Sequence, residues 1–205
     1  MARPRRDPDA IPTETRILRA AEDTFGREGF TRARLSDIAE MAGIRRPSLL
    51  YHFKTKEALY DAVVHQLFDE LRARFVMTVQ NPGGYESRML ALMQSWIDFI
   101  EEKPAFSSMV LRGVLDGYGP VRDRLLVELV PLLDWVEGWL STAGAEFIPE
   151  GVPVRAAILQ LGSDALVRGA SGPLRGPLWG DNPGTLKLAR MLLIRESASS
   201  STDGG

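Results

Sequence analysis

The sequence predicts an all-α protein, with a three-helix head at its N-terminus and a larger helical body. Apolar residues recur three and four positions apart over most of the 205 residues, which is the period of an amphipathic helix. Clusters of proline and glycine separate these periodic segments. No stretch alternates polar and apolar residues over a length sufficient for a β-strand, and no internal repeat occurs.

The composition is that of an ordinary globular protein, with 44% hydrophobic and 25% charged residues. The chain has no cysteine, which excludes disulfides, thiolate metal sites and cysteine nucleophiles. No apolar run approaches the roughly 18 residues that a membrane span needs. The arginine-rich start is not followed by the apolar region of a secretory signal. We therefore expect a cytoplasmic protein without a membrane partner.

The first segments are a basic arm and a helix. Residues 1–12 hold three prolines and three arginines, and either a solvated tail or an arm that contacts DNA fits this composition. Residues 13–28 are predicted to form a helix that Gly29 ends. The apolar stripe of this helix consists of Ile17, Leu18, Ala21 and Phe25.

Residues 34–53 have the pattern of a helix-turn-helix. The apolar face of the first of its helices consists of Leu35, Ile38, Ala39 and Ala42. Gly43 is expected to take the left-handed conformation that ends this helix, and Pro47 suits the first turn of the next. Leu49 and Phe53 then face inward. A plain helical hairpin would share this pattern, so the flanking residues decide between the two interpretations.

Those flanks form the run AGIRRPSLLYHFKTKEALY, which resembles the DNA-binding domain of the tetracycline-repressor (TetR) family. The resemblance covers residues 13–60. The matching positions are Ala42, Gly43, Ile44, Leu49, His52, Phe53, Lys56, Glu57 and Leu59. Two departures are Leu50, where many relatives have tyrosine, and the pair Ala33 and Arg34, where many have threonine. The resemblance implies a homodimeric, ligand-responsive transcription regulator, most often a repressor, that binds double-stranded DNA at a near-palindromic operator.

Residues 1–56 carry an excess of four positive charges and the remainder an excess of six negative ones, which favours a basic head that contacts nucleic acid. Side chains expected to read base edges are Arg45, Arg46, Pro47, Ser48 and Tyr51. Those expected to contact phosphates are Arg34, His52 and Lys56. For His52, a packed or capping histidine is an equally open interpretation.

The body, residues 57–196, is predicted to consist of further helices. Their expected ranges are 56–79, 85–102, 105–115, 121–142, 153–169 and 185–196. A break is expected at 81–84 and loops at 116–120 and 171–184, whereas Pro131 should kink or restart its helix. Thr55 is a plausible N-cap for the first of these helices. The tail, residues 197–205, is too polar to fold.

Two surfaces of the body are candidate binding sites. The residues that could line a ligand pocket are Met89, Met93, Trp96, Ile100, Phe106 and Met109, although a stripe at helical spacing is more often core. The family resemblance places a dimer interface on the last two long helices. The corresponding residues are Leu125, Leu129, Leu133, Val136, Leu140, Ile158, Leu161 and Ala165.

No feature of the sequence favours an enzyme. His52 and His65 lie without a nucleophile motif or a phosphate-binding loop, and no motif indicates a metal or a cofactor. Asp98 and Asp164 interrupt apolar stretches, and each is expected to be exposed or to face a cationic ligand. The alternative to a ligand-responsive regulator is a DNA-bound adaptor, whose body would recruit a protein partner without a small-molecule effector.

Overall fold

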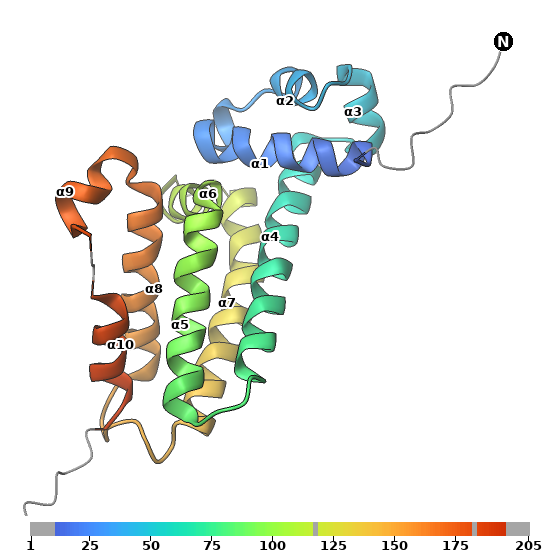
Figure 1. Ribbon diagram of the computed structural model, residues 1–205. Coiled ribbons are helices and arrows are strands. Elements are labelled where there is room, and N and C mark those ends of the chain that lie inside the picture. Colours follow the sequence, from blue (N-terminus) through green and yellow to red (C-terminus); the bar gives the residue numbers. More distant parts are fainter. Residues whose placement is uncertain (1–10, 117–118, 182–183, 196–205) are drawn as a thin grey trace, which may run out of the picture. The chain divides into compact units, whose positions relative to one another are not determined.

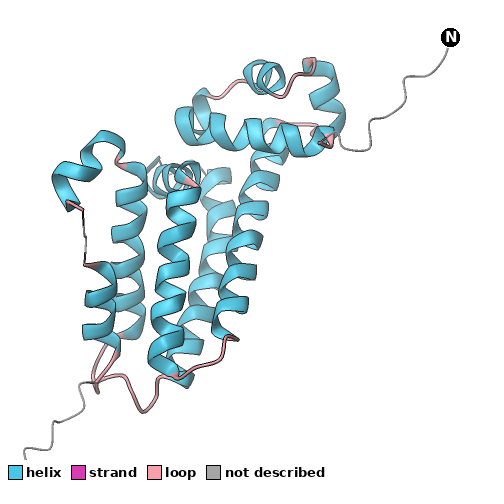
Figure 2. Ribbon diagram, viewed as in Figure 1, coloured by secondary structure: helices cyan, strands magenta, loops and turns pink. Residues whose placement is uncertain are grey.

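The computed structural model describes residues 11–116, 119–181 and 184–195, and over this range it contains helices and loops but no strand (Figure 2). The predicted all-α fold is confirmed. The segments predicted as the arm and the tail fall on 1–10 and 196–205, outside the described residues. The elements are α1 (Thr13–Arg32), α2 (Leu35–Met41), α3 (Arg46–His52), α4 (Lys56–Val79), α5 (Tyr85–Glu102), α6 (Pro104–Asp116), α7 (Gly119–Ala143), α8 (Val154–Ala170), the 3-10 turn η1 (Gly172–Leu174), α9 (Arg175–Trp179) and α10 (Thr185–Leu193).

Local signals place several helix ends where the sequence predicts them. The ranges of α4 and α5 are those predicted, and the Thr55 hydroxyl accepts a hydrogen bond from the backbone N–H of Ala58 at 3.0 Å, as an N-cap does. At Gly29 the backbone leaves the helical region, with φ of 76°, although regular hydrogen bonding resumes up to Arg32. Glycine tolerates this conformation because it has no Cβ.

Two predictions for the body were wrong, and a third is decided only in part. The segment 171–184 is not a plain loop, because η1 and α9 form within it and their prolines lie in first turns, where no N–H is needed. The last helix ends at Leu193, after which Ile194 is extended. Helix α7 runs continuously through Pro131, so the helix does not restart there, and the alternative of a kink stays a prediction.

The chain divides into two compact units, and α4 and α7 each contribute residues to both. The first unit comprises residues up to Glu70 and Lys103–Glu128. In it, α1 packs on α2 and on α6 (Figure 1). A Cβ at Gly26 would lie 2.5 Å from the Cβ of Ala105, so this contact between α1 and α6 needs glycine. The aromatic rings of Phe25, Phe30 and Tyr60 pack edge-on or stacked and join α1 to the start of α4.

The second unit comprises Leu71–Glu102 and the chain from Leu129 onward. Helix α8 packs against α5 and α10, which Figure 1 shows side by side. Tyr85, at the start of α5, stacks on Phe147 and Trp139 with ring centroids 5.3 and 6.0 Å away. Its buried hydroxyl has no hydrogen-bond partner, and burial raises the pKa of Tyr85 to about 12.

Candidate nucleic-acid interface

The turn between α2 and α3 has the geometry that the sequence predicts. Gly43 has φ of 66°, and its N–H donates to the carbonyl of Glu40 at 2.9 Å. The N–H of Ile44 donates to the carbonyl of Ala39 at 2.9 Å, which closes the end of α2. Pro47 lies in the first turn of α3. These bonds fix the direction in which α3 leaves the turn, and Leu49 anchors α3 because its side chain is fully buried.

The side chains predicted to read bases share the outward face of α3 and its N-cap. Arg45, Arg46, Pro47 and Ser48 are exposed, and Tyr51 is 77% exposed. Lys54 lies over the Tyr51 ring, 5.5 Å from its centroid, and adds a third cation beside Arg45 and Arg46. The face therefore combines cations, a hydroxyl and an aromatic ring, the groups that major-groove recognition uses.

The residues predicted to contact phosphates lie in different surroundings. Arg34, at the N-cap of α2, and His52 are both exposed. Lys56 is half-buried, and its ammonium donates to the carbonyls of Thr31 at 3.2 Å and Ala33 at 3.1 Å. An ammonium has three N–H donors, so at most one is left for a phosphate. The sequence pattern did not predict this structural role.

The sequence also did not predict a role for two arginines on α1. Arg16 and Arg19 line an open hollow of about 410 Å³ beside Met41 and Gly43, at the end of α2. The Nε atom of Arg16 is buried and has no hydrogen-bond partner. Two guanidinium groups at an open hollow provide a place for an anion such as a phosphate. Both arginines are far in sequence from Met41 and Gly43, and only the fold brings them together.

The comparisons with known proteins identify this region. Residues 17–63 match the family model described as "Bacterial regulatory proteins, tetR family". This segment contains α2, α3 and the turn between them, together with most of α1 and the start of α4. This segment therefore resembles the DNA-binding domain of the TetR family. The resemblance predicted from the sequence is therefore confirmed.

Two curated relatives of this chain are named as transcription factors. The HTH-type transcriptional regulator RutR of Escherichia coli (strain K12) is 55% identical over 130 residues, which cover 62% of this chain and 61% of RutR. The HTH-type transcriptional activator FasR of Mycolicibacterium smegmatis is 32% identical over 85 residues, 42% of this chain and 39% of FasR. The match with RutR spans about three fifths of that relative's length. Both names agree with the expectation of a regulator rather than an enzyme.

Among solved structures, the regulator FadR of Bacillus subtilis, crystallised with stearoyl-CoA, has a TM-score of 0.72 at 15% identity. This likeness covers 87% of the chain and 97% of FadR. A fatty acid degradation regulator FadR from Bacillus halodurans has a TM-score of 0.70 at 13% identity, over 93% of the chain and 98% of the relative. At these identities the likeness shows the fold, which extends over the body as well as the DNA-binding head.

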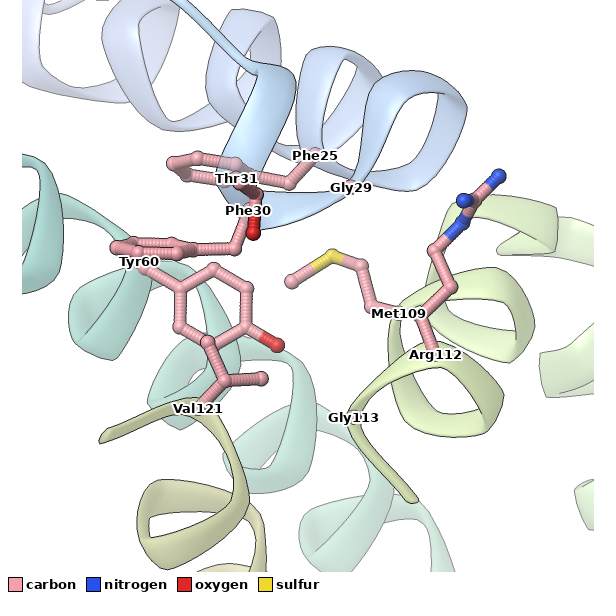
Figure 3. A pocket seen from close by; sticks show the side chains of 9 residues that line it. All are labelled: Phe25, Gly29, Phe30, Thr31, Tyr60, Met109, Arg112, Gly113 and Val121. Atoms are coloured by element: carbon pink, nitrogen blue, oxygen red, sulfur yellow. The ribbon is translucent and has the colours of Figure 1, made fainter. Parts of the chain in front are cut away.

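The residues predicted to line a ligand pocket are mostly core. Met89, Ile100 and Phe106 are almost completely buried, which fits tight packing better than an open pocket. Met93 and Trp96 are half-buried. Met109 lines a cavity of about 20 Å³, whose other residues are Phe25, Gly29, Phe30, Thr31, Tyr60, Arg112, Gly113 and Val121 (Figure 3). This volume fits about one water molecule rather than an effector.

Figure 3 shows Tyr60 and Met109 directed toward one another across that cavity, from α4 and α6. Burial raises the pKa of Tyr60 well above its usual value, with a smaller contribution from the charge of Asp61. The hydroxyl of Tyr60 therefore stays protonated at neutral pH and supplies one donor to the cavity.

Most residues predicted for the dimer interface belong to the core of a single chain. Leu125, Val136, Leu140, Leu161 and Ala165 are buried within the protomer, and their part in a dimer interface stays a prediction. The periodicity gave the right face of each helix but not what covers it. Leu129, Leu133 and Ile158 are half-buried, and for them the interface stays a prediction. The exposed apolar side chains of α7 and α8 are Leu126, Val127, Val130, Trp135, Leu159 and Val167.

His65 lies between two carboxylates. Its Nε2 is 3.1 Å from Asp69 Oδ2, and its Nδ1 is 3.0 Å from Oε1 of the buried Glu128. Glu128 also accepts a hydrogen bond from Arg124 at 2.5 Å. This ion-pair network joins α4 to α7 within the first unit.

Within the described ranges, no group of three or more histidine, aspartate or glutamate side chains is arranged to hold a metal ion. No helix of the described residues has the length and apolar character to span a membrane.

Asp98 and Asp164, which interrupt apolar stretches of the sequence, lie in different surroundings. Asp98 is exposed and accepts a hydrogen bond from Gln94 at 2.6 Å, which makes it a surface residue. Asp164 is half-buried, and its carboxylate accepts hydrogen bonds from the side chains of Trp179 and Thr185. Asp164 thereby ties residues that follow α8 back to that helix.

Proposed function

We propose that this chain is a homodimeric, ligand-responsive transcription regulator of the cytoplasm, which represses by binding a near-palindromic operator. The observation that carries the proposal is the exposed face of α3, which presents Arg45, Arg46, Ser48 and Tyr51 on a helix anchored by Leu49. The family match over residues 17–63 and the regulator names of the relatives support it.

In this proposal, α3 enters the major groove and its first turn reads base edges. Arg45 and Arg46 pair with guanine O6 and N7, and Ser48 and Tyr51 contact neighbouring bases or the backbone. Arg34 and His52 contact phosphates, with Lys56 contributing its remaining donor. A two-fold dimer sets two such helices roughly 34–36 Å apart, which explains the near-palindromic operator.

Dimerisation would use α7 and α8, as the family resemblance implies. Arg155 on α8 donates to Asp134 at 2.7 Å and to Glu137 at 3.0 Å, which joins the two helices at one place. The exposed side chains of Trp135 and Leu159 lie close along the sequence to these ion-paired residues. Exposed apolar groups beside a rigid helix pair support an interface with a second copy.

The response to an effector follows as a population shift. A ligand that binds one conformation of the body better than another favours that conformation. Helix α4 transmits the change, because it begins beside the DNA-binding head and continues to Val79. The complex of the FadR fold neighbour with stearoyl-CoA supports an effector site in this fold.

A second candidate is the DNA-bound adaptor. Its support is the exposed apolar side chains after α8, which are Leu174, Leu178, Leu188 and Met191. Such side chains suit a protein partner. A measurable affinity for a small effector favours the regulator, whereas a partner that binds only when these leucines are intact favours the adaptor.

The test is selection of bound duplexes from a random DNA pool at two salt concentrations. The regulator should enrich a near-palindrome, and its affinity should fall with a log–log salt slope that counts the phosphate contacts. Weak and unselective binding that depends steeply on salt would contradict the proposal, since it would leave only an electrostatic attraction to DNA.

A further inference from the structure

Arg168, in the last turn of α8, is a buried charge without a partner. Its side chain is 2% exposed, and its buried Nη2 atom donates no hydrogen bond in the structure. A guanidinium stays charged at every pH that a protein survives. Burying a charge without an acceptor is among the most costly features that a fold can have. An acceptor from outside the chain would remove this cost.

The carboxylate best placed to neutralise Arg168 is engaged elsewhere. Asp164 lies one turn earlier on α8, at the spacing at which side chains meet on a helix. Its Oδ1 accepts a hydrogen bond from Trp179 Nε1 at 2.8 Å, and its Oδ2 accepts one from Thr185 Oγ1 at 3.0 Å. Both oxygens of Asp164 are therefore held by residues that follow α8, and the guanidinium of Arg168 keeps donors available for another acceptor.

The residues on the same face of α8 are apolar. Ala157, Leu161 and Ala165 precede Arg168 at spacings of four, four and three, and all are buried. Arg168 thus continues an apolar stripe. These side chains are packed in the closed structure, so an anion would reach them only after the residues that follow α8 have opened. It would then meet a charged group at one end and hydrocarbon along the rest, which fits a carboxylate on a small apolar body.

The segment after α8 provides a route to the site. No side chain of η1 or α9 is buried, and Leu174 and Leu178 are exposed. Because this segment buries little apolar surface, it opens at a lower cost than the helices that precede it. Its ties to the rest of the unit include the bond from Trp179 to Asp164 and the ion pair of Arg175 with Glu101.

We propose that Arg168 anchors the carboxylate of a small organic acid with an apolar body. The inference rests on the proposed function and deepens it, because it gives the chemical class of the effector. The guanidinium donates two parallel hydrogen bonds to the carboxylate, as arginine does in buried carboxylate sites.

The experiment compares the full-length wild type with two variants, Arg168→Met and the matched control Arg175→Met. Arg175 is a suitable control because it is an exposed arginine that pairs with Glu101 in the wild type. Thermal unfolding and calorimetric titration are measured with benzoate and octanoate, with their neutral amides, and with inorganic phosphate at equal ionic strength. The acids should raise the melting temperature of the wild type and of Arg175→Met, and the amides should not. In Arg168→Met the affinity for the acids should fall about 30-fold or more.

Without ligand, Arg168→Met should melt at or above the wild-type temperature, because an apolar side chain replaces an uncompensated charge. A clear fall in its melting temperature would overturn the proposal, since it would show that the guanidinium stabilises the free protein. Equal protection by acids and amides, or protection by none of the probes, would also overturn it. Protection by phosphate alone would replace the carboxylate with a phosphate ligand.

These measurements contain no DNA. A protein that selects an operator but binds no acid would refute the effector class and leave the DNA-binding function intact. A protein that binds acids through Arg168 but selects no DNA sequence would refute the proposed function instead. The two failures are therefore distinguishable.

Discussion

The ammonium of Lys56 lies 3.1 Å from the carbonyl oxygen of Ala33, so the first residue of α4 is bonded to the link between α1 and α2. A second bond reaches the carbonyl of Thr31, and the same ammonium lies 4.6 Å from the centroid of the Phe30 ring. Carbonyls at the end of a helix favour a nearby cation. Lys56 therefore positions the helix-turn-helix relative to α4, whether or not it also contacts a phosphate.

Lys56→Met should lower the free energy of unfolding by about 1–2 kcal/mol, because two carbonyls lose a charged donor. Urea denaturation measures this change. Lys54→Met is the control, since Lys54 is exposed and donates only to the carbonyl of Tyr51 at 3.4 Å. An unchanged stability together with a salt slope of DNA binding reduced by about 1 would mean that Lys56 acts at a phosphate instead.

Gly43→Ala should destabilise the head by about 1 kcal/mol. The positive φ of Gly43 is the reason, because the nearest atom to an added Cβ is 3.5 Å away and no clash arises. Gly84→Ala is the matched control, since an added Cβ there meets nothing within 4 Å and its backbone φ is not positive. Equal unfolding free energies of the two variants would show that the turn does not need glycine.

Tyr85→Phe should reduce the loss of stability that the protein shows at alkaline pH. Burial raises the pKa of Tyr85 from 10.0 to about 12, so the folded state favours the neutral phenol. The stability that this provides is complete below pH 10 and is lost as the pH rises from 10 toward 12. The variant keeps the ring stacking and removes a buried hydroxyl without a partner, so at pH 7 it should be as stable as the wild type or more stable.

The measurement is the difference in unfolding free energy between wild type and Tyr85→Phe at pH 7 and at several values above pH 10. That difference should shift in favour of the variant as the pH rises. A difference that stays constant over the whole range would show that the phenol titrates alike in the folded and unfolded chains.

The sequence alone predicted the head well, because its signals are local. Gly43 needs a positive φ, Pro47 fits a first turn and Thr55 caps α4, and each acts within four residues of itself. The ends of α4 and α5 were predicted for the same reason. The short helices η1 and α9 were missed because proline and glycine suit both loops and first turns.

Features that depend on distant contacts could not be predicted in this way. A leucine stripe has the same period whether its own chain or a partner covers it, so the sequence could not show that Leu125 and Leu161 are buried within the protomer. The bonds of Lys56 span 23 and 25 residues. A signal for Arg168 was present, since it continues the apolar register of α8, but its lack of a partner is visible only in the fold.

The central claim is that the outward face of α3 reads bases. The measurement that tests it most directly is the affinity of wild type, Arg46→Ala and Arg122→Ala for the selected operator and for operators changed at single positions. Arg122 is the control, because it is an exposed arginine on α7 that pairs with Asp123. Arg46→Ala should lose about 1–3 kcal/mol and discriminate less at one position of each half-site, with Arg122→Ala unchanged. Equal affinities and equal base preferences for the three proteins would contradict the docking of α3.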